Sequence, residues 1–99
     1  MQIGKTRDGN VLTIKLEGRL DTITAPELES ALEGSLTDLT TLVFDMEKLE
    51  YISSAGLRVL LSSHKKMLAS SGQMIVKNVS EEIMEIFEVT GFSDILTIE

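Results

Sequence analysis

The pattern of apolar and polar residues in the first part of the chain predicts a strand and a hairpin partner. Residues 11–17 combine alternation with β-branched side chains, which predicts a strand that ends at Gly18. A Gly-Asn turn signal begins at Gly9, and the residues before it suit a short antiparallel neighbour. The chain is therefore expected to open with two paired strands.

Further extended segments follow in the middle and at the end of the chain. Residues 40–45 form a short apolar run with β-branched members, typical of a buried, central strand. Residues 73–78 predict another strand, and residues 94–99 suit a short terminal one. Each of these segments is separated from the previous one by a helical pattern.

A capping box predicts the first helix. Thr24 takes the N-cap position and Glu27 the N3 position, so each side chain is expected to accept the other residue's free backbone N–H. Pro26 lies in the first turn, where its missing N–H costs little. The helix is expected to run to about Leu36.

Two more helices are predicted by apolar spacings of three and four residues. The second starts at Ser53 or Ser54 and is ended by Gly72, and the third starts at Ser80 and is ended by Gly91. The expected inner faces comprise Leu57, Leu60, Leu61, His64, Met67 and Leu68 in the second helix and Ile83, Ile86, Phe87 and Thr90 in the third. This alternation of strands and helices predicts an α/β fold with helices packed against a mixed or parallel sheet.

Composition narrows the class of protein. The 99 residues are 42% apolar, which suits a single domain spanning residues 1–99. There is no cysteine, no apolar leader and no apolar run long enough to cross a membrane, so we expect a soluble, cytoplasmic protein with no membrane partner. A net charge of −7, from 16 acidic and 9 basic residues, disfavours direct binding of nucleic acid.

The most informative segment is the start of the second helix, Ser53-Ser54-Ala55-Gly56. Backbone N–H groups in a first helical turn have no acceptor within the helix, and the partial positive charge there favours an anion. Ligands in open α/β sheets also gather where strands lead into helices. Two interpretations follow: a serine that caps the helix, or a cap that is also a phosphorylation site.

An enzymatic role for this serine is not supported. A hydrolase nucleophile would need Gly two residues before the serine, but Ile52 stands two before Ser54. The one histidine, His64, lies on the same helix and is directed away from its start, so no triad can form. There is also no phosphate-binding Gly-rich loop and no His or Cys cluster for a metal. We therefore expect a non-enzyme without cofactor or metal.

The chain resembles, along its whole length, a STAS domain, and most specifically a bacterial anti-sigma factor antagonist. The matching segments are Gly18-Arg19-Leu20-Asp21, Leu42-Val43-Phe44-Asp45 with Leu49 and Ile52, Ser53-Ser54-Ala55-Gly56-Leu57, and Val89-Thr90-Gly91-Phe92. The resemblance implies the STAS fold, a mixed β-sheet of four to five strands with helices packed against it.

The resemblance also implies a site. In that family the usual segment is Asp-Ser-(Ser/Thr/Ala)-Gly-Leu, and a partner kinase phosphorylates the serine after the Asp. The phospho-acceptor would then be Ser54, with Ala55 and Gly56 completing the turn and Ser53 in the position of the Asp. Asp21 takes the place of an acidic residue in the loop that faces this turn.

Partner switching is the function that the resemblance implies. The unphosphorylated protein would bind an anti-sigma factor that is itself a serine kinase, and the sigma factor would be released. Phosphorylation by that kinase would break the complex, and a serine phosphatase would restore it. The alternative is an accessory STAS module of a lipid-transport or stress-signalling assembly, or one that binds a nucleotide, since a fold alone does not fix a function.

A purely structural role is an alternative to a functional one for several of these residues. Asp21 either closes a turn with its side chain or makes a partner contact, directly or through a metal on the kinase. Arg58 is either solvated or a contact for a carboxylate on the partner. His64 is more simply a buried or half-buried core residue than a catalytic base.

Overall fold

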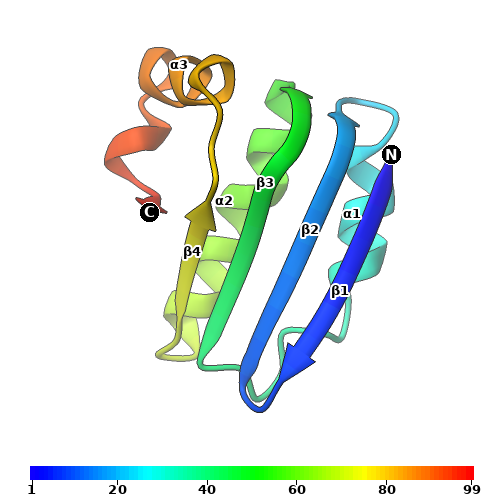
Figure 1. Ribbon diagram of the computed structural model, residues 1–99. Coiled ribbons are helices and arrows are strands. Elements are labelled where there is room, and N and C mark those ends of the chain that lie inside the picture. The colour runs from blue at the N-terminus through cyan, green and yellow to red at the C-terminus, as the bar shows by residue number, and fades with distance from the viewer.

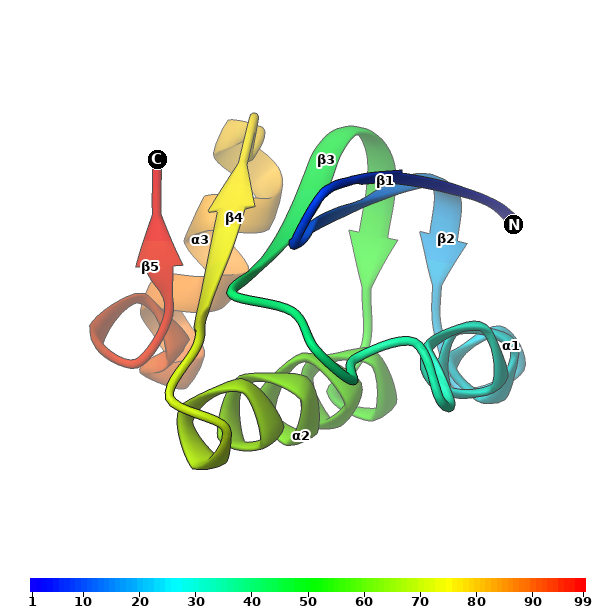
Figure 2. The ribbon, with the colours of Figure 1, turned by 90° about the horizontal axis from the view of Figure 1, so that it is seen from below.

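The sheet arranges its strands in the order in which the chain makes them. A computed structural model describes all residues, 1–99, and shows one five-stranded sheet of order β1-β2-β3-β4-β5 (Figures 1 and 2). The strands are β1 (Gln2–Asp8), β2 (Val11–Leu20), β3 (Thr41–Ile52), β4 (Gln73–Lys77) and β5 (Thr97–Ile98). β1 and β2 are antiparallel, and every other neighbouring pair is parallel. The expected mixed sheet with a central β3 is confirmed.

The helices lie in two places relative to this sheet. They are α1 (Ala25–Leu32), α2 (Ser54–Ala69) and α3 (Glu81–Thr90), with a short 3-10 helix η1 (Phe92–Asp94) after α3. α1 and α2 lie side by side against one face, and α3 follows the carboxyl end of β4, apart from them (Figures 1 and 2). The parallel strands are therefore linked by helical crossovers, as the alternating pattern predicts.

The core forms where β2 and β3 face the helices. Leu12, Ile14 and Leu16 of β2 are buried between exposed or half-exposed neighbours, which is the alternation of a strand with one covered face. One cluster of 22 buried residues joins them to Phe44 of β3 and Phe87 of α3. Since each fully buried large apolar side chain contributes about 1.5–3 kcal/mol, this cluster is the main source of stability.

Both long strands extend beyond their predicted ends. β2 continues to Leu20 and does not end at Gly18, and β3 continues to Ile52. The pairing of β2 with β3 is irregular near Leu16 and at Gly18, whose φ is +103°. Because of these irregularities, buried and exposed residues do not alternate one by one in the second half of β3. Its apolar pattern there is therefore not typical of a strand.

The predicted capping box at Thr24 is wrong, and α1 is shorter than expected. Thr24 is the N-cap residue, but it has helical backbone angles and its side chain makes no capping bond. Its hydroxyl instead accepts the Asp21 N–H in the preceding loop. α1 ends at Leu32, before Gly34, whose φ of +73° is incompatible with a continuing helix. Pro26 lies in the first turn, as predicted.

The ends of the other helices are largely as predicted. Ser80 caps α3 by accepting the Ile83 N–H at 3.2 Å, and Gly91 ends it in the left-handed conformation. After α2 it is Ser71, and not Gly72, that has positive φ. Gly72 is required for another reason, because a Cβ there would lie 2.7 Å from the Met67 side chain and 3.0 Å from the Thr40 carbonyl oxygen.

Two residues of the predicted inner faces are exposed and lie outside the core. Leu68 is exposed, and so is Thr90, whose hydroxyl donates to the Ile86 carbonyl at 2.7 Å. His64 is half-buried, as expected, and its Nδ1 has no hydrogen-bond partner.

Candidate functional site

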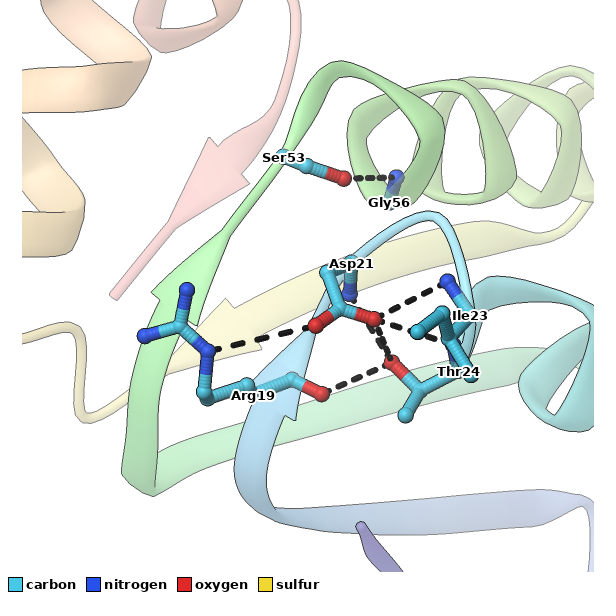
Figure 3. Close-up of polar contacts among 6 residues, drawn as sticks. All are labelled: Arg19, Asp21, Ile23, Thr24, Ser53 and Gly56. Carbon is cyan, nitrogen blue, oxygen red and sulfur yellow. Dashed lines mark hydrogen bonds and ion pairs between the residues drawn. The ribbon is translucent and has the colours of Figure 1, made fainter.

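The predicted site residues meet where β2 and β3 end. Leu20 pairs with Ile52 in the parallel ladder, and the Ser53 N–H donates to the Leu20 carbonyl at 2.9 Å. The loop that begins at Asp21 therefore lies beside the turn that begins α2 (Figure 3). Two segments that are far apart in the sequence form one surface at the carboxyl edge of the sheet.

Ser53 is the N-cap of α2. It has an extended backbone, its Oγ accepts the Gly56 N–H at 3.4 Å, and its carbonyl accepts the Leu57 N–H at 2.9 Å. Of the two serines considered as caps, Ser53 takes this role. Ser54 is the first residue of the helix, and its side chain is exposed. Its hydroxyl makes no hydrogen bond within the chain and is accessible to a modifying enzyme.

Gly56 allows the helix to begin close to the sheet. A Cβ at this position would lie 2.7 Å from Leu20 Cγ and 2.9 Å from Ile52 Cγ1, well inside the contact distance of carbon atoms. Gly56 is buried and Ala55 is half-buried. The two residues therefore shape the turn more than they present side chains to solvent.

Asp21 organises the loop on the other side of the site. Its Oδ1 accepts the N–H groups of Ile23 at 3.0 Å and Thr24 at 3.1 Å (Figure 3). The Thr24 hydroxyl accepts the Asp21 N–H at 2.8 Å and lies 2.7 Å from the Arg19 carbonyl oxygen. The Asp21 carbonyl accepts the Ala25 N–H at 2.8 Å. The loop is thus fixed by its own side chains, and the turn-closing role considered for Asp21 is present.

An arginine and a tyrosine flank the site, and neither was predicted from the sequence to belong to it. Arg19 and Tyr51 are paired across β2 and β3, and the Arg19 guanidinium lies 4.3 Å from the Tyr51 ring centroid. Arg19 Nε is also 3.9 Å from Asp21 Oδ2. Tyr51 is 37% exposed, and Ile23 in the adjacent loop is 81% exposed. Only the register of the two strands brings these residues together, and that register is not readable from the sequence.

Arg58 lies one helical turn beyond Ser54. It is exposed, and residues four apart on a helix share a face, so it belongs to the same surface as the serine. No three His, Cys, Asp or Glu side chains gather in a way that could hold a metal ion.

Comparison with known proteins identifies the family. The family model described as "STAS domain" matches residues 2–99. The chain belongs to the STAS domain family. An anti-sigma-B factor antagonist from Listeria monocytogenes is 30% identical over 96 residues, covering 96% of this chain and 84% of that protein. The STAS domain described here thus belongs among the anti-sigma factor antagonists.

Solved structures show the same fold. An anti-sigma factor antagonist from Mycobacterium paratuberculosis aligns with this STAS domain at a TM-score of 0.86 and 23% identity, over 98% of this chain and 83% of that one. Bacillus SpoIIAA in its phosphorylated form aligns at a TM-score of 0.78 and 19% identity, over 99% of this chain and 91% of that one. The fold therefore occurs in a protein that carries a phosphoryl group.

The hydrogen bonds around Asp21 favour the ionised form of its carboxyl group. The Thr24 N–H lowers the pKa of the Asp21 carboxyl most, with further contributions from the Ile23 N–H, the Thr24 hydroxyl and the Arg19 charge. The carboxylate is therefore ionised at neutral pH.

No helix of the STAS domain has both the length and the apolar character needed to cross a membrane.

Proposed function

We propose that this STAS domain antagonises an anti-sigma factor by partner switching, with Ser54 as the switch. In its unphosphorylated form it binds a serine-kinase anti-sigma factor and frees the sigma factor. Phosphorylation of Ser54 by that kinase breaks the complex, and a serine phosphatase restores it. One observation carries the proposal: Ser54 is exposed at the first position of α2, directly after the cap, on the surface shared with the Asp21 loop.

The position of Ser54 allows phosphorylation without unfolding. A phosphoryl group adds about −1.5 to −2 charges at neutral pH, which the partial positive charge of a helix N-terminus favours. The same charge opposes burial in an interface, because it would have to lose its hydration there. Modification can therefore reject a partner while the fold remains intact.

The other predicted site residues support this role in different ways. Ser53 caps the helix, and Ala55 and Gly56 bring the turn close to the sheet. Arg58 offers an exposed forked donor to a carboxylate on the partner. Asp21 orders the loop opposite Ser54. The proposed interface thus comprises an unmodified hydroxyl that the kinase can phosphorylate, an adjacent cation and an ordered loop.

The proposed function involves no chemistry by this chain itself. It is the substrate of a kinase and a phosphatase, and it needs no cofactor or metal of its own. A regulator of a sigma factor acts in the cytoplasm through another protein, and the net charge of −7 fits a protein partner better than nucleic acid. The partner can be recovered with the unphosphorylated chain and identified by mass spectrometry.

Phosphorylation mapping tests the assignment of the acceptor. After incubation with the purified kinase and ATP, peptide mass spectrometry should place one phosphoryl group on Ser54. Ser54→Ala should abolish labelling. Ser53→Ala, which removes the neighbouring hydroxyl of the cap, should still be labelled. Labelling of Ser53, or full labelling of Ser54→Ala, would contradict the assignment.

Calorimetric titration tests the switch. Ser54→Ala should keep most of the affinity for the kinase, since it removes only a hydroxyl. Ser54→Asp should lose about 2–5 kcal/mol, or roughly thirtyfold to several thousandfold, because it buries a charge without a partner. Equal affinities for Ser54→Asp and the parent would leave the fold unchanged, rule out the switch and favour an accessory STAS module.

A further inference from the structure

We infer that Ile23 is the apolar anchor of the kinase interface, and that Asp21 acts by holding Ile23 in place. The inference deepens the proposed function and rests on it. It names a residue for which neither the sequence pattern nor the family resemblance suggested a role. Three observations carry it: the exposure of Ile23, the bonding of its loop and the position of this loop beside the turn that begins α2.

Ile23 is unusually exposed for an apolar residue in a well-ordered loop. Its exposed fraction is 81%, and its loop begins at Asp21, whose carboxylate faces Arg19. The Arg19 guanidinium in turn lies against the ring of the partly exposed Tyr51. A single exposed apolar residue is common and needs no explanation. Here, however, the loop that carries the isoleucine follows the strand end where Arg19 pairs with Tyr51, and these two are residue types enriched at the centres of protein interfaces.

The loop holds the Ile23 backbone in one conformation. The Ile23 N–H and the Thr24 N–H both donate to Asp21 Oδ1, and the Thr24 hydroxyl accepts the Asp21 N–H. A side chain presented from a fixed backbone loses less conformational entropy when a partner covers it. The loop therefore presents an apolar group that is already positioned for binding.

The same bonds limit what Asp21 itself can offer. Oδ1 already accepts two backbone N–H groups, and Oδ2 is directed to Arg19 at 3.9 Å. A carboxylate used in this way contributes mainly to the loop. Asp21 is accordingly a positioning residue, and its effect on the partner passes through Ile23.

The position of Ile23 places it within reach of an interface centred on Ser54. It lies three positions after Leu20, whose carbonyl accepts the Ser53 N–H, and three residues span at most about 11 Å. A standard interface covers about 800 Å² on each partner, which corresponds to a radius of roughly 16 Å. Because the Asp21 loop lies beside the Ser54 turn, we expect a kinase that reaches the Ser54 hydroxyl to cover Ile23 as well, and we assign it an apolar pocket beside its active site.

Val89 supplies a matched control. It is 80% exposed, almost the same as Ile23, but it lies on α3 and outside the loop and turn that form the site. Ile23→Ala should weaken binding of the purified kinase to the unphosphorylated chain by at least about tenfold and raise the KM for phosphorylation with little change in kcat. Val89→Ala should match the parent, and Ile23→Leu should recover most of the loss.

A double-mutant cycle tests the role of Asp21. Asp21→Ala should weaken binding in the parent but have little further effect in the Ile23→Ala background, because its contribution passes through Ile23. Asp21→Asn, which keeps an oxygen acceptor, should bind more tightly than Asp21→Ala. A full additional loss from Asp21→Ala in the Ile23→Ala background would show that Asp21 contacts the kinase directly and would overturn this part of the inference.

The remaining outcomes separate the inference from the proposed function. If Ser54→Asp loses affinity while Ile23→Ala does not, the switch stands and the anchor is wrong. The anchor is also wrong if Val89→Ala is as harmful as Ile23→Ala. Sedimentation checks for a different occupant: a change in self-association of Ile23→Ala, with kinase affinity unchanged, would assign Ile23 to contact with a second copy of this chain and contradict the inference.

Discussion

The Ser53 N–H and the Leu20 carbonyl are joined by a hydrogen bond of 2.9 Å, the last link between β2 and β3. It sets the Asp21 loop and the Ser54 turn at the same level of the sheet. No side-chain contact between the two segments is needed for this arrangement. The site is consequently as rigid as the sheet that supports it.

The cap at Ser53 should contribute modestly to stability. Ser53→Ala is expected to lower the free energy of unfolding by about 0.5–1 kcal/mol, at the low end for N-caps because the Oγ to Gly56 N distance of 3.4 Å is long. Thermal unfolding should show the loss, and Ser53→Asp, which keeps an acceptor, should match the parent. An unchanged midpoint for Ser53→Ala would show that the cap bond contributes nothing.

Ser54 should tolerate a negative charge. Because it is exposed in the first turn of α2, Ser54→Asp is expected to fold with unchanged stability or a gain of up to about 1 kcal/mol. Thermal unfolding at low ionic strength measures the effect, with Ser54→Asn as the uncharged control. A marked loss in Ser54→Asp but not in Ser54→Asn would contradict the favourable helix-end charge.

Gly56 should be intolerant of any side chain. Gly56→Ala forces a carbon atom to within 2.7 Å of Leu20 Cγ, so we expect a loss of about 1–3 kcal/mol from overpacking. Gly4→Ala is the control, since a Cβ there meets only Lys15 Cβ at an ordinary 3.6 Å. Chemical denaturation of the two variants should separate them clearly, and equal stabilities would show that α2 can move away from the sheet at no cost.

The Asp21 loop should be insensitive to pH near neutrality. Its hydrogen bonds, that from the Thr24 N–H first, lower the pKa of Asp21, so the unfolded chain binds the proton more tightly than the folded one. The stabilisation is complete above the pKa of an unfolded aspartate, about 3.9, and is lost as the pH falls through the lower pKa of the folded state.

NMR titration checks this sign. The Ile23 and Thr24 amide signals should shift with a midpoint below that of aspartate in an unfolded peptide, and Asp21→Asn should remove the transition. A midpoint above the peptide value would mean that desolvation outweighs the hydrogen bonds of the loop.

The sequence was sufficient for those parts of the fold that depend on local signals. Ser80 and Gly91 mark the ends of α3 because a hydroxyl cap and a left-handed glycine act within one turn. The helix start at Ser53-Ser54 is likewise local. A mixed or parallel sheet with helices packed against it followed from the alternation of strand and helix patterns, since right-handed crossovers leave few topologies.

Features that depend on contacts distant in sequence were not predictable. Thr24 has the sequence of a capping residue, but Asp21 and the end of β2 engage its hydroxyl. Gly72 resembles a helix stop, although its small size is needed for the approach of Met67 and Thr40. The Arg19 and Tyr51 contact requires the strand register, and the irregular pairing of β2 and β3 shifts that register.

At the start of α2, the residues that stabilise the fold differ from the residues that are exposed to a partner. The half-buried cap at Ser53 and the buried Gly56 form the turn there, whereas Ser54, Arg58 and, in the neighbouring loop, Ile23 are exposed. Exchanges at the outward positions leave the scaffold untouched. Duplicated copies of such a chain can therefore diverge in partner choice at little cost in stability, and parallel regulatory circuits in one cell can remain insulated from each other through a handful of solvent-facing residues.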